Sequence, residues 1–330
     1  MQELPKADKL SAIHHYVPQS YLLRFSPNTK KSQIYTYEVD KKTYLTSISN
    51  IAGQRGFYNF IDTDGSKTSE LEEAFALIDG AGINLIEALD KHSTGFVELP
   101  EKELADLYAY IAFLHTRNVN QKRQLANSFG ETTLLQLQVH ASAKEYFHKI
   151  AKEVLKDDYD YEKAENERNM LLEGKMEVKF DATEQYFMGR ALDLSKTLYE
   201  VLWLHKKLVI VEKETAVKGR IITSDNPVTY YPPEGYPKGA PLGYLQAVFQ
   251  VPVSPSRLLL LVNRNVTLKR FTLNERLVQW HNYYTFRDAE RWVFSNSDDA
   301  QVAANFKKYN DKRPRLVMDT PFKRLDKNIG

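Results

Sequence analysis

The spacing of hydrophobic positions changes twice along the chain and divides it into three predicted parts. The first, residues 12–62, contains short stretches in which apolar and polar residues alternate, notably 33–39 and 43–48 on either side of the charged turn 40–42. Alternation around such a turn predicts a β-hairpin. A further aromatic strand is expected over residues 57–60, so this opening is predicted to be rich in β structure.

Residues 69–205 form the second part, where apolar positions recur at helical intervals. Helices are expected over four ranges: 70–91, 100–129, 132–156 and 182–205. Ser69 provides an N-cap for the first, and Pro100 with the acidic residues after it begins the second. Residues 157–181 are dense in charge, which leaves three interpretations: an exposed helix, a lid or an insertion.

The third part, residues 206–309, returns to β structure with late helices. Strands are expected over 208–212, 220–223, 247–252, 257–262 and 291–294, and helices over 274–282 and 298–308. Four prolines and three glycines make residues 230–243 a loop, and 310–330 is expected to be a poorly ordered tail. The prediction is an α+β fold in which β-rich ends surround a helical bundle, packed as a single domain over residues 1–330.

Composition narrows the class of protein. Hydrophobic residues make up 42% of the 330 residues, enough for a large core, and 45 Lys+Arg nearly balance 43 Asp+Glu. This balance lacks the basic excess of a protein held to nucleic acid by charge alone, although it permits a local basic groove. The absence of cysteine excludes disulfides, thiolate metal sites and cysteine nucleophiles.

The N-terminal residues 1–11 are polar and charged, unlike a signal peptide. The longest purely aliphatic run, residues 258–262, is too short to cross a bilayer. We therefore expect a cytoplasmic protein with no membrane partner; the oligomeric state is not indicated.

Two adjacent histidines, His14 and His15, precede a tyrosine, a valine, Pro18 and Gln19. Imidazole titrates near neutrality and binds metals, so the pair marks a candidate site. Neighbouring side chains of an extended segment point in opposite directions, so only one of the two is expected to enter a given site.

The helix expected from residue 70 carries two carboxylates on an apolar face. Glu72, Phe75, Asp79, Ile83 and Ile86 follow helical spacing and share one side. Carboxylates beside a core require a cation, a metal or hydrogen-bond donors. Salt bridges to a neighbouring helix are at least as good an interpretation as a metal site.

A partner is available on the next helix, where Leu107, Tyr110, Leu114 and Arg117 form one stripe. Pairing of Arg117 with Glu72 or Asp79 is the favoured interpretation, and binding of a phosphate is the functional alternative. His115 is expected to be partly exposed.

Asp225 and Asn226 follow an apolar strand and precede Pro227. At such a strand end Asp225 could orient a histidine or bind a metal, or it could hold nearby backbone amides in an Asx turn. These two interpretations are evenly balanced. The phosphate-binding loop, the dinucleotide fingerprint, His-Glu-x-x-His and the nucleophile elbow are all absent, so no nucleotide cofactor is indicated.

The chain resembles a bacterial family known as domain of unknown function 4238. The resemblance is carried by residues 14–19, 21–22, 25, 57–58, 71–72, 78–79, 117 and 223–227, and by 251–255 before 258–261. It departs from the family pattern at Asp79, where glutamate is expected, and at Asn118-Val119, where Thr-Pro is expected. The resemblance implies a shared fold and site and no established activity.

The sequence is compatible with two candidate functions. The first is a metal-assisted phosphodiester hydrolase resembling a nuclease, with nucleic acid as substrate and a place in bacterial defence. Under this hypothesis His14 or His15 acts as general base or metal ligand, and Arg117 stabilises the charge of the phosphate. The metal ion, Mg or Mn, is bound by the carboxylates Glu72, Asp79 and Asp225. Residues that would support this site are Gln19, Tyr58 and Asn226.

The second function is a non-catalytic ligand-binding or regulatory protein whose polar cluster is structural. Geometry distinguishes the two. A nuclease needs His14 or His15 and at least two of the carboxylates converging in an open, positively rimmed cleft, whereas dispersed carboxylates, or carboxylates sealed by Arg117, favour binding.

Overall fold

The computed structural model describes residues 13–38, 40–58, 60–61, 67–68, 70–178, 184–237 and 242–310. The chain forms two compact units. Of the described residues, those from 13 to 121 and from 184 to 310 make up the first, and residues 122–178 make up the second. The expected tail from residue 311 lies outside the described residues. Helices together with sheets that are antiparallel except for one short parallel pair give the predicted α+β class.

A six-stranded sheet is the centre of the first unit. Its strands are β7 (Gly95–Val97), β8 (Lys206–Lys213), β10 (Thr229–Tyr231), β11 (Val248–Ser254), β12 (Arg257–Asn263) and β13 (Thr272–Leu273). The order is β10-β11-β12-β8-β13, with β7 also paired to β8. Strands β8, β11 and β12 are buried over most of their length, which explains their nearly continuous apolar sequence.

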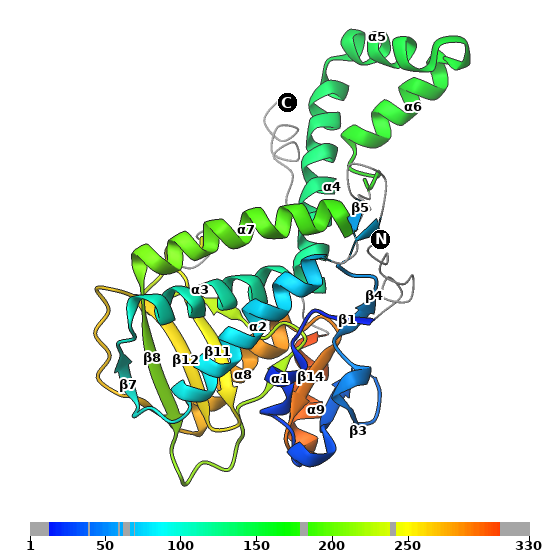
Figure 1. Cartoon of the computed structure of the whole chain (residues 1–330). Coiled ribbons are helices and arrows are strands. Elements are labelled where there is room, and N and C mark those ends of the chain that lie inside the picture. The colour runs from blue at the N-terminus through cyan, green and yellow to red at the C-terminus, as the bar shows by residue number, and fades with distance from the viewer. Residues whose placement is uncertain are drawn as a thin grey trace, which may run out of the picture. The chain divides into compact units, whose positions relative to one another are not determined.

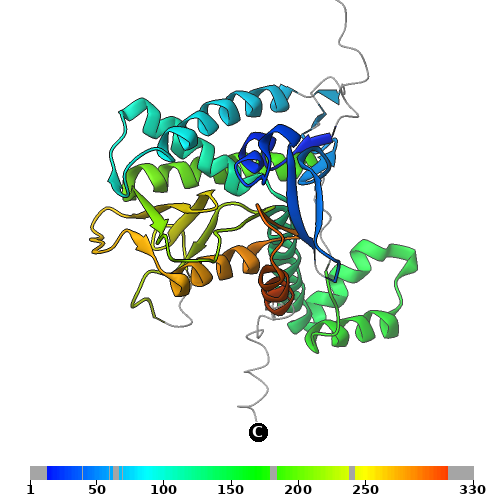
Figure 2. The ribbon, with the colours of Figure 1, turned by 90° about the horizontal axis from the view of Figure 1, so that it is seen from below.

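Helices cover both faces of this sheet. Helices α2 (Glu70–Leu89), α3 (Glu101–Thr116) and α7 (Glu184–His205) lie over one face, and α8 (Glu275–Asp288) lies over the other (Figures 1 and 2). The predicted apolar face of α2 is buried at Phe75, Ile83 and Ile86. On the opposite side of the sheet, Val278 and Tyr284 of α8 join the core.

A four-stranded sheet in the order β3-β2-β14-β9 completes the first unit. Its strands are β2 (Gln33–Glu38), β3 (Tyr44–Ser47), β9 (Thr223–Ser224) and β14 (Trp292–Ser295), and α9 (Ala300–Asn310) packs against it. The pairing of β2 with β3 confirms the predicted hairpin. Two small pairs are β1 (Ile13–His15) with β4 (Gly53–Arg55), and β5 (Phe60–Ile61) with β6 (Lys67–Thr68). The aromatic strand expected from residue 57 is wrong at its start, because residues 56–58 form a turn.

The short helix α1 (Gln19–Leu23) fastens the N-terminal segment to both sheets. The hydroxyl of Tyr21 donates to the carbonyl of residue 252 at 2.7 Å and lies 3.0 Å from the hydroxyl of Thr223. Arg24 donates to the carbonyl of residue 253 and to Asp90, both at 2.6 Å. The segments that carry the family resemblance therefore contact one another.

The helix expected over residues 100–129 is interrupted. Helix α3 ends at Thr116, Arg117 leaves helical geometry with φ −94° and ψ 23°, and α4 (Val119–Ser142) begins after Asn118. The side-chain oxygen of Asn118 accepts a hydrogen bond from the backbone amide of Gln121 at 3.0 Å, and Asn118 therefore caps α4. Asparagine is a common N-cap, and this signal could have located the break.

The second unit contains the greater part of α4 together with α5 (Lys144–Leu155) and α6 (Tyr161–Leu172). The helix expected over 132–156 is therefore two helices, separated at Ala143. Of the charged segment 157–181, residues 157–178 are described, and most of them are helical, in the end of a short 3-10 helix (Lys156–Asp158) and in α6. Asp160 caps α6 by accepting the amide of Lys163 at 2.8 Å.

Two glycines of α2 differ in how closely they approach α3, so alanine should have opposite effects on stability at the two positions. A Cβ at Gly82 would overlap the ring of Tyr110, whereas a Cβ at Gly80 would meet nothing within 4 Å. We expect Gly82→Ala to lower the free energy of unfolding by about 1–3 kcal/mol. Gly80→Ala should raise it by up to about 1 kcal/mol, because alanine favours helix. Urea unfolding followed by circular dichroism measures both, and equal effects would contradict this packing.

Candidate functional site

The extended strand β1 separates the two histidines as predicted. His14 is fully buried and His15 is partly exposed. The Nδ1 atom of His14 accepts the backbone N–H of Tyr58 at 2.8 Å, and the two rings stack with centroids 5.4 Å apart. The Nε2 atom of His14 lies 3.2 Å from a carboxylate oxygen of Glu72. Burial lowers the pKa of His14, against the opposing charge of Glu72.

His15 belongs to the local structure of the N-terminal motif. Its Nε2 atom lies 3.2 Å from the carbonyl of Ser49, and its Nδ1 atom lies 3.2 Å from the amide nitrogen of Gln19. The hydroxyl of Tyr58 donates to the carbonyl of His15 at 3.1 Å. Gln19 and Tyr58, both predicted as supporting residues, therefore contact the histidines.

One face of α2 brings four of the predicted residues together in two pairs. Glu72 contacts His14, and Asp79, two turns further along, forms an ion pair with Arg117. Phe75 lies between them and packs on Tyr58 with centroids 4.9 Å apart. The guanidinium carbon of Arg117 lies 5.3 Å from the centre of the Phe75 ring. Arg117 thus pairs with Asp79, one of its two predicted partners.

Arg117 is 1% exposed, whereas its partner Asp79 is 19% exposed. Only Nη2 of the guanidinium contacts Asp79; among the described residues Nε and Nη1 have no hydrogen-bond partner, nor has the buried hydroxyl of Tyr110. Burial works to lower the pKa of Arg117, but Tyr58 and Asp79 hold it above its ordinary value, so the guanidinium stays charged.

Asp225 is bound to backbone amides from a distant part of the chain. One carboxylate oxygen accepts the amide of Glu290 at 2.8 Å, and the other accepts those of Arg291 at 2.7 Å and Trp292 at 3.0 Å. Burial raises the pKa of Asp225 to about 6, and these three hydrogen bonds oppose the shift. Asp225 therefore fixes the start of β14.

Asn226 connects the same turn to the junction between α3 and α4. Its side-chain oxygen accepts from Asn118 at 2.9 Å, and its amide group donates to the carbonyl of Asp288 at 3.2 Å. Like Asp225, it holds other parts of the chain in place. In the described ranges no group of three or more His, Asp or Glu side chains is placed to hold a metal ion.

His115 was expected to be partly exposed, and this is wrong, because it is 1% exposed. Its Nδ1 atom lies 3.0 Å from the carbonyl of Val228, and its Nε2 atom 3.0 Å from the hydroxyl of Tyr244. The rings of Tyr230 and Phe249 also contact it. Burial lowers its pKa to about 4. Segments more than a hundred residues away cover this side of α3, and helical spacing alone cannot indicate that.

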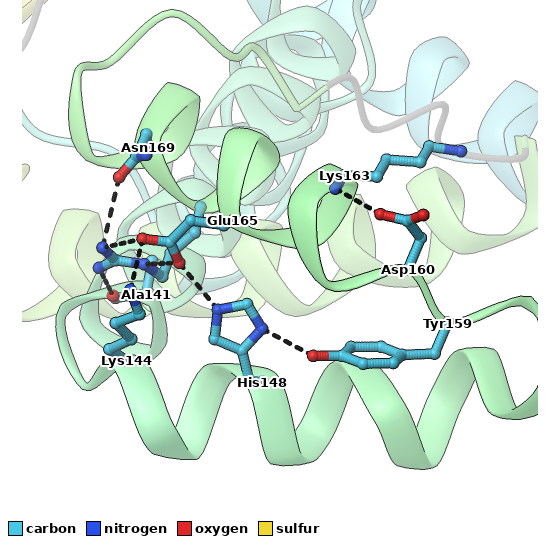
Figure 3. A network of polar contacts seen from close by, with 9 residues as sticks. Ala141, Lys144, His148, Tyr159, Asp160, Lys163, Glu165 and Asn169 are labelled. Carbon is cyan, nitrogen blue, oxygen red and sulfur yellow. Dashed lines mark hydrogen bonds and ion pairs between the residues drawn. The ribbon is translucent and has the colours of Figure 1, made fainter.

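The second unit contains a polar network that sequence reasoning missed (Figure 3). Glu165 accepts from Arg168 at 2.9 Å, from His148 at 2.8 Å and from Lys144 at 3.0 Å. These three side chains lower the pKa of Glu165, with Arg168 the largest cause. The spacing of Glu165 and Arg168 on one helix was visible in the sequence, but the contacts from α5 were not. The network joins α5 to α6.

Comparison with known proteins gives one match. The family described as "Protein of unknown function (DUF4238)" matches residues 13–299, and the chain belongs to this family. No curated protein and no solved structure matches the chain. Among the helices of the described residues, none has the length and hydropathy needed to traverse a bilayer.

Proposed function

We propose that this member of the family is a binding or regulatory protein that holds a phosphate-bearing ligand through Arg117. The supporting observation is the state of its guanidinium, which is buried and charged and has two of its three nitrogens without a hydrogen-bond partner among the described residues. Buried donors without acceptors cost free energy. A phosphate oxygen would satisfy them with charge-assisted hydrogen bonds.

Asp79 is the group that a phosphate would replace. Its carboxylate is the more exposed partner of the ion pair, so it can return to water while Arg117 stays in place. A phosphate offers more charge and more acceptor oxygens than the single carboxylate. The Tyr110 hydroxyl would be an additional donor, because it is buried and has no hydrogen-bond partner among the described residues.

The arrangement of the carboxylates favours binding over metal-assisted hydrolysis. Asp79 is neutralised by Arg117, and both oxygens of Asp225 accept backbone amides. Of the three predicted metal ligands, only Glu72 approaches a histidine and has a largely accessible side chain, 42% exposed.

Phosphodiester hydrolysis is the second candidate function, and the contact between Glu72 and His14 favours it. Mg or Mn is often bound by one or two carboxylates together with substrate phosphates, so Glu72 would be the protein ligand and nucleic acid the substrate. Under this candidate function the proposed setting is bacterial defence.

Thermal unfolding in sodium phosphate tests the first proposal. Phosphate at about 100 times its dissociation constant should stabilise the wild type by about 2.7 kcal/mol relative to sodium chloride of equal ionic strength. This corresponds to a rise of about 4 °C in melting temperature. Arg117→Lys, which keeps the charge with fewer donors, should lose most of the rise. Arg190→Lys is the control, because Arg190 is exposed on α7 and forms an ion pair with Asp193 one turn along the same helix. An equal rise in Arg117→Lys and wild type would reject the proposal.

A further inference from the structure

The described part of the second unit exposes many of its large apolar side chains. Eight such side chains are exposed between residues 135 and 161, as many as in all the other described residues together. They are Leu135, Leu137, Val139, Tyr146, Ile150, Val154, Leu155 and Tyr161. Apolar side chains that gather on one part of a surface mark a site of interaction.

Helix α5 contributes a regular apolar stripe to this surface. None of the residues of α5 is buried. Tyr146, Ile150 and Val154 follow one another at intervals of four residues, and they are 39–71% exposed. His148 lies on the opposite side of the helix, where it points toward Glu165 of α6 (Figure 3). Because α6 packs on that side, the α5 stripe, formed by Tyr146, Ile150 and Val154, is open to a partner.

Charges of both signs border the α5 stripe on one edge. Lys149 and Glu153 immediately precede Ile150 and Val154 in the sequence and lie beside them on the helix. Among the described residues, neither of these charged side chains has a hydrogen bond or an ion pair. Both charges are therefore available to a partner that presents the opposite pattern.

We propose that α5 packs in antiparallel orientation on α5 of a second copy of this chain. A two-fold axis beside residue 151 places each residue opposite the one that is equally far from 151 in the second copy. Lys149 then faces Glu153 of the second copy, and Glu153 faces its Lys149. The two α5 stripes interdigitate, as ridges of side chains four residues apart do where helices pack. The complementarity of this edge to itself is the reason to assign a second copy rather than an unrelated partner.

The contact between two α5 helices gives a dimer of limited strength. Helix α5 has 12 residues, which corresponds to a length of about 18 Å. A contact of this length buries less than the roughly 800 Å² per partner of a typical stable complex. We therefore expect a dimer that dissociates in the micromolar range. This dimer goes beyond the phosphate proposal and does not depend on Arg117.

Sedimentation equilibrium of the full chain between about 1 and about 300 µM tests the dimer. The mean mass of the wild type should rise with concentration toward that of a dimer. Ile150→Glu should weaken association at least about tenfold, because it places a charge in the apolar contact. Leu77→Glu is the control and should associate like wild type, because Leu77 is an exposed apolar residue of α2. Circular dichroism checks that both variants keep their helices.

A charge exchange distinguishes a second copy from any other partner. Lys149→Glu and Glu153→Lys should each weaken association at least about tenfold, because each places like charges opposite one another. An equimolar mixture of these two variants should associate about as tightly as wild type, since every facing pair is then of opposite charge.

Three results would overturn the proposal. They are a wild type that stays monomeric, a dimer that Ile150→Glu leaves intact, and a mixture of the charge variants that associates no better than either variant alone. A monomeric wild type that binds phosphatidylglycerol vesicles, where Ile150→Glu does not, would assign the α5 stripe to a lipid surface instead.

Discussion

Replacing Asp79 by alanine should lower the free energy of unfolding by about 3–5 kcal/mol, because it leaves a buried guanidinium without its counter-charge. Arg117 is 1% exposed and cannot be solvated where it lies, whereas Asp79 is 19% exposed. Arg117→Met should therefore cost less than Asp79→Ala, because the carboxylate that remains can reach water. The loss of stability should therefore be larger in Asp79→Ala than in Arg117→Met.

Urea unfolding of wild type, Asp79→Ala and Arg117→Met measures these losses of stability. Glu87→Ala is the control. Glu87 lies on the same helix, and its side chain is exposed. This control should change stability by no more than about 0.5 kcal/mol. Phosphate should stabilise Asp79→Ala more than wild type, because the competing carboxylate is gone. If Asp79→Ala is as stable as Glu87→Ala, the ion pair does not neutralise Arg117.

Acidification below neutrality should destabilise the protein through its buried histidines. Burial lowers the pKa of His115 to about 4 and that of His281 to about 3, and it lowers those of His14 and His15 as well. Below about pH 6.5 the unfolded chain binds protons that the native chain does not, so stability falls as the pH falls. This contribution is fully present above pH 6.5 and is lost progressively toward pH 4. For His115 the loss is about 3 kcal/mol.

The variant His115→Gln isolates this contribution. Asp225, whose pKa burial raises to about 6, acts in the opposite sense, so the informative quantity is the difference between variant and wild type. Between about pH 7 and about pH 4.5 the wild type should lose about 2–3 kcal/mol more than His115→Gln. His92→Gln, at an exposed position, should behave like wild type. A parallel pH dependence of His115→Gln and wild type would show that folding does not lower the pKa of His115.

Features encoded by short-range spacing were predictable from the sequence. The alternation around residues 40–42 predicted the pairing of β2 with β3. Helical spacing placed Phe75 and Asp79 on one face of α2, and the stripe on α3 placed Arg117 near it. Aspartate at position 79, where the family pattern has glutamate, is still long enough to reach Arg117.

Features that depend on distant segments were not predictable in the same way. The sequence left Asp225 evenly balanced between two roles, because the amides that it binds belong to residues 290–292. The sequence also left both Glu72 and Asp79 as possible partners for Arg117. Helical spacing within each helix does not determine which turn of α2 faces the end of α3. The burial of His115 likewise depends on Tyr244 and Val228, which only the folded chain brings to it.

Calorimetric titration of inorganic phosphate into the full chain near pH 7 tests the central claim, that Arg117 holds a phosphate. We predict a single binding event in the wild type and in Arg190→Lys, tighter binding in Asp79→Ala, and binding weakened at least about tenfold in Arg117→Lys, equivalent to about 1.4 kcal/mol. Absence of binding in the wild type, or equal affinity in Arg117→Lys, would contradict it.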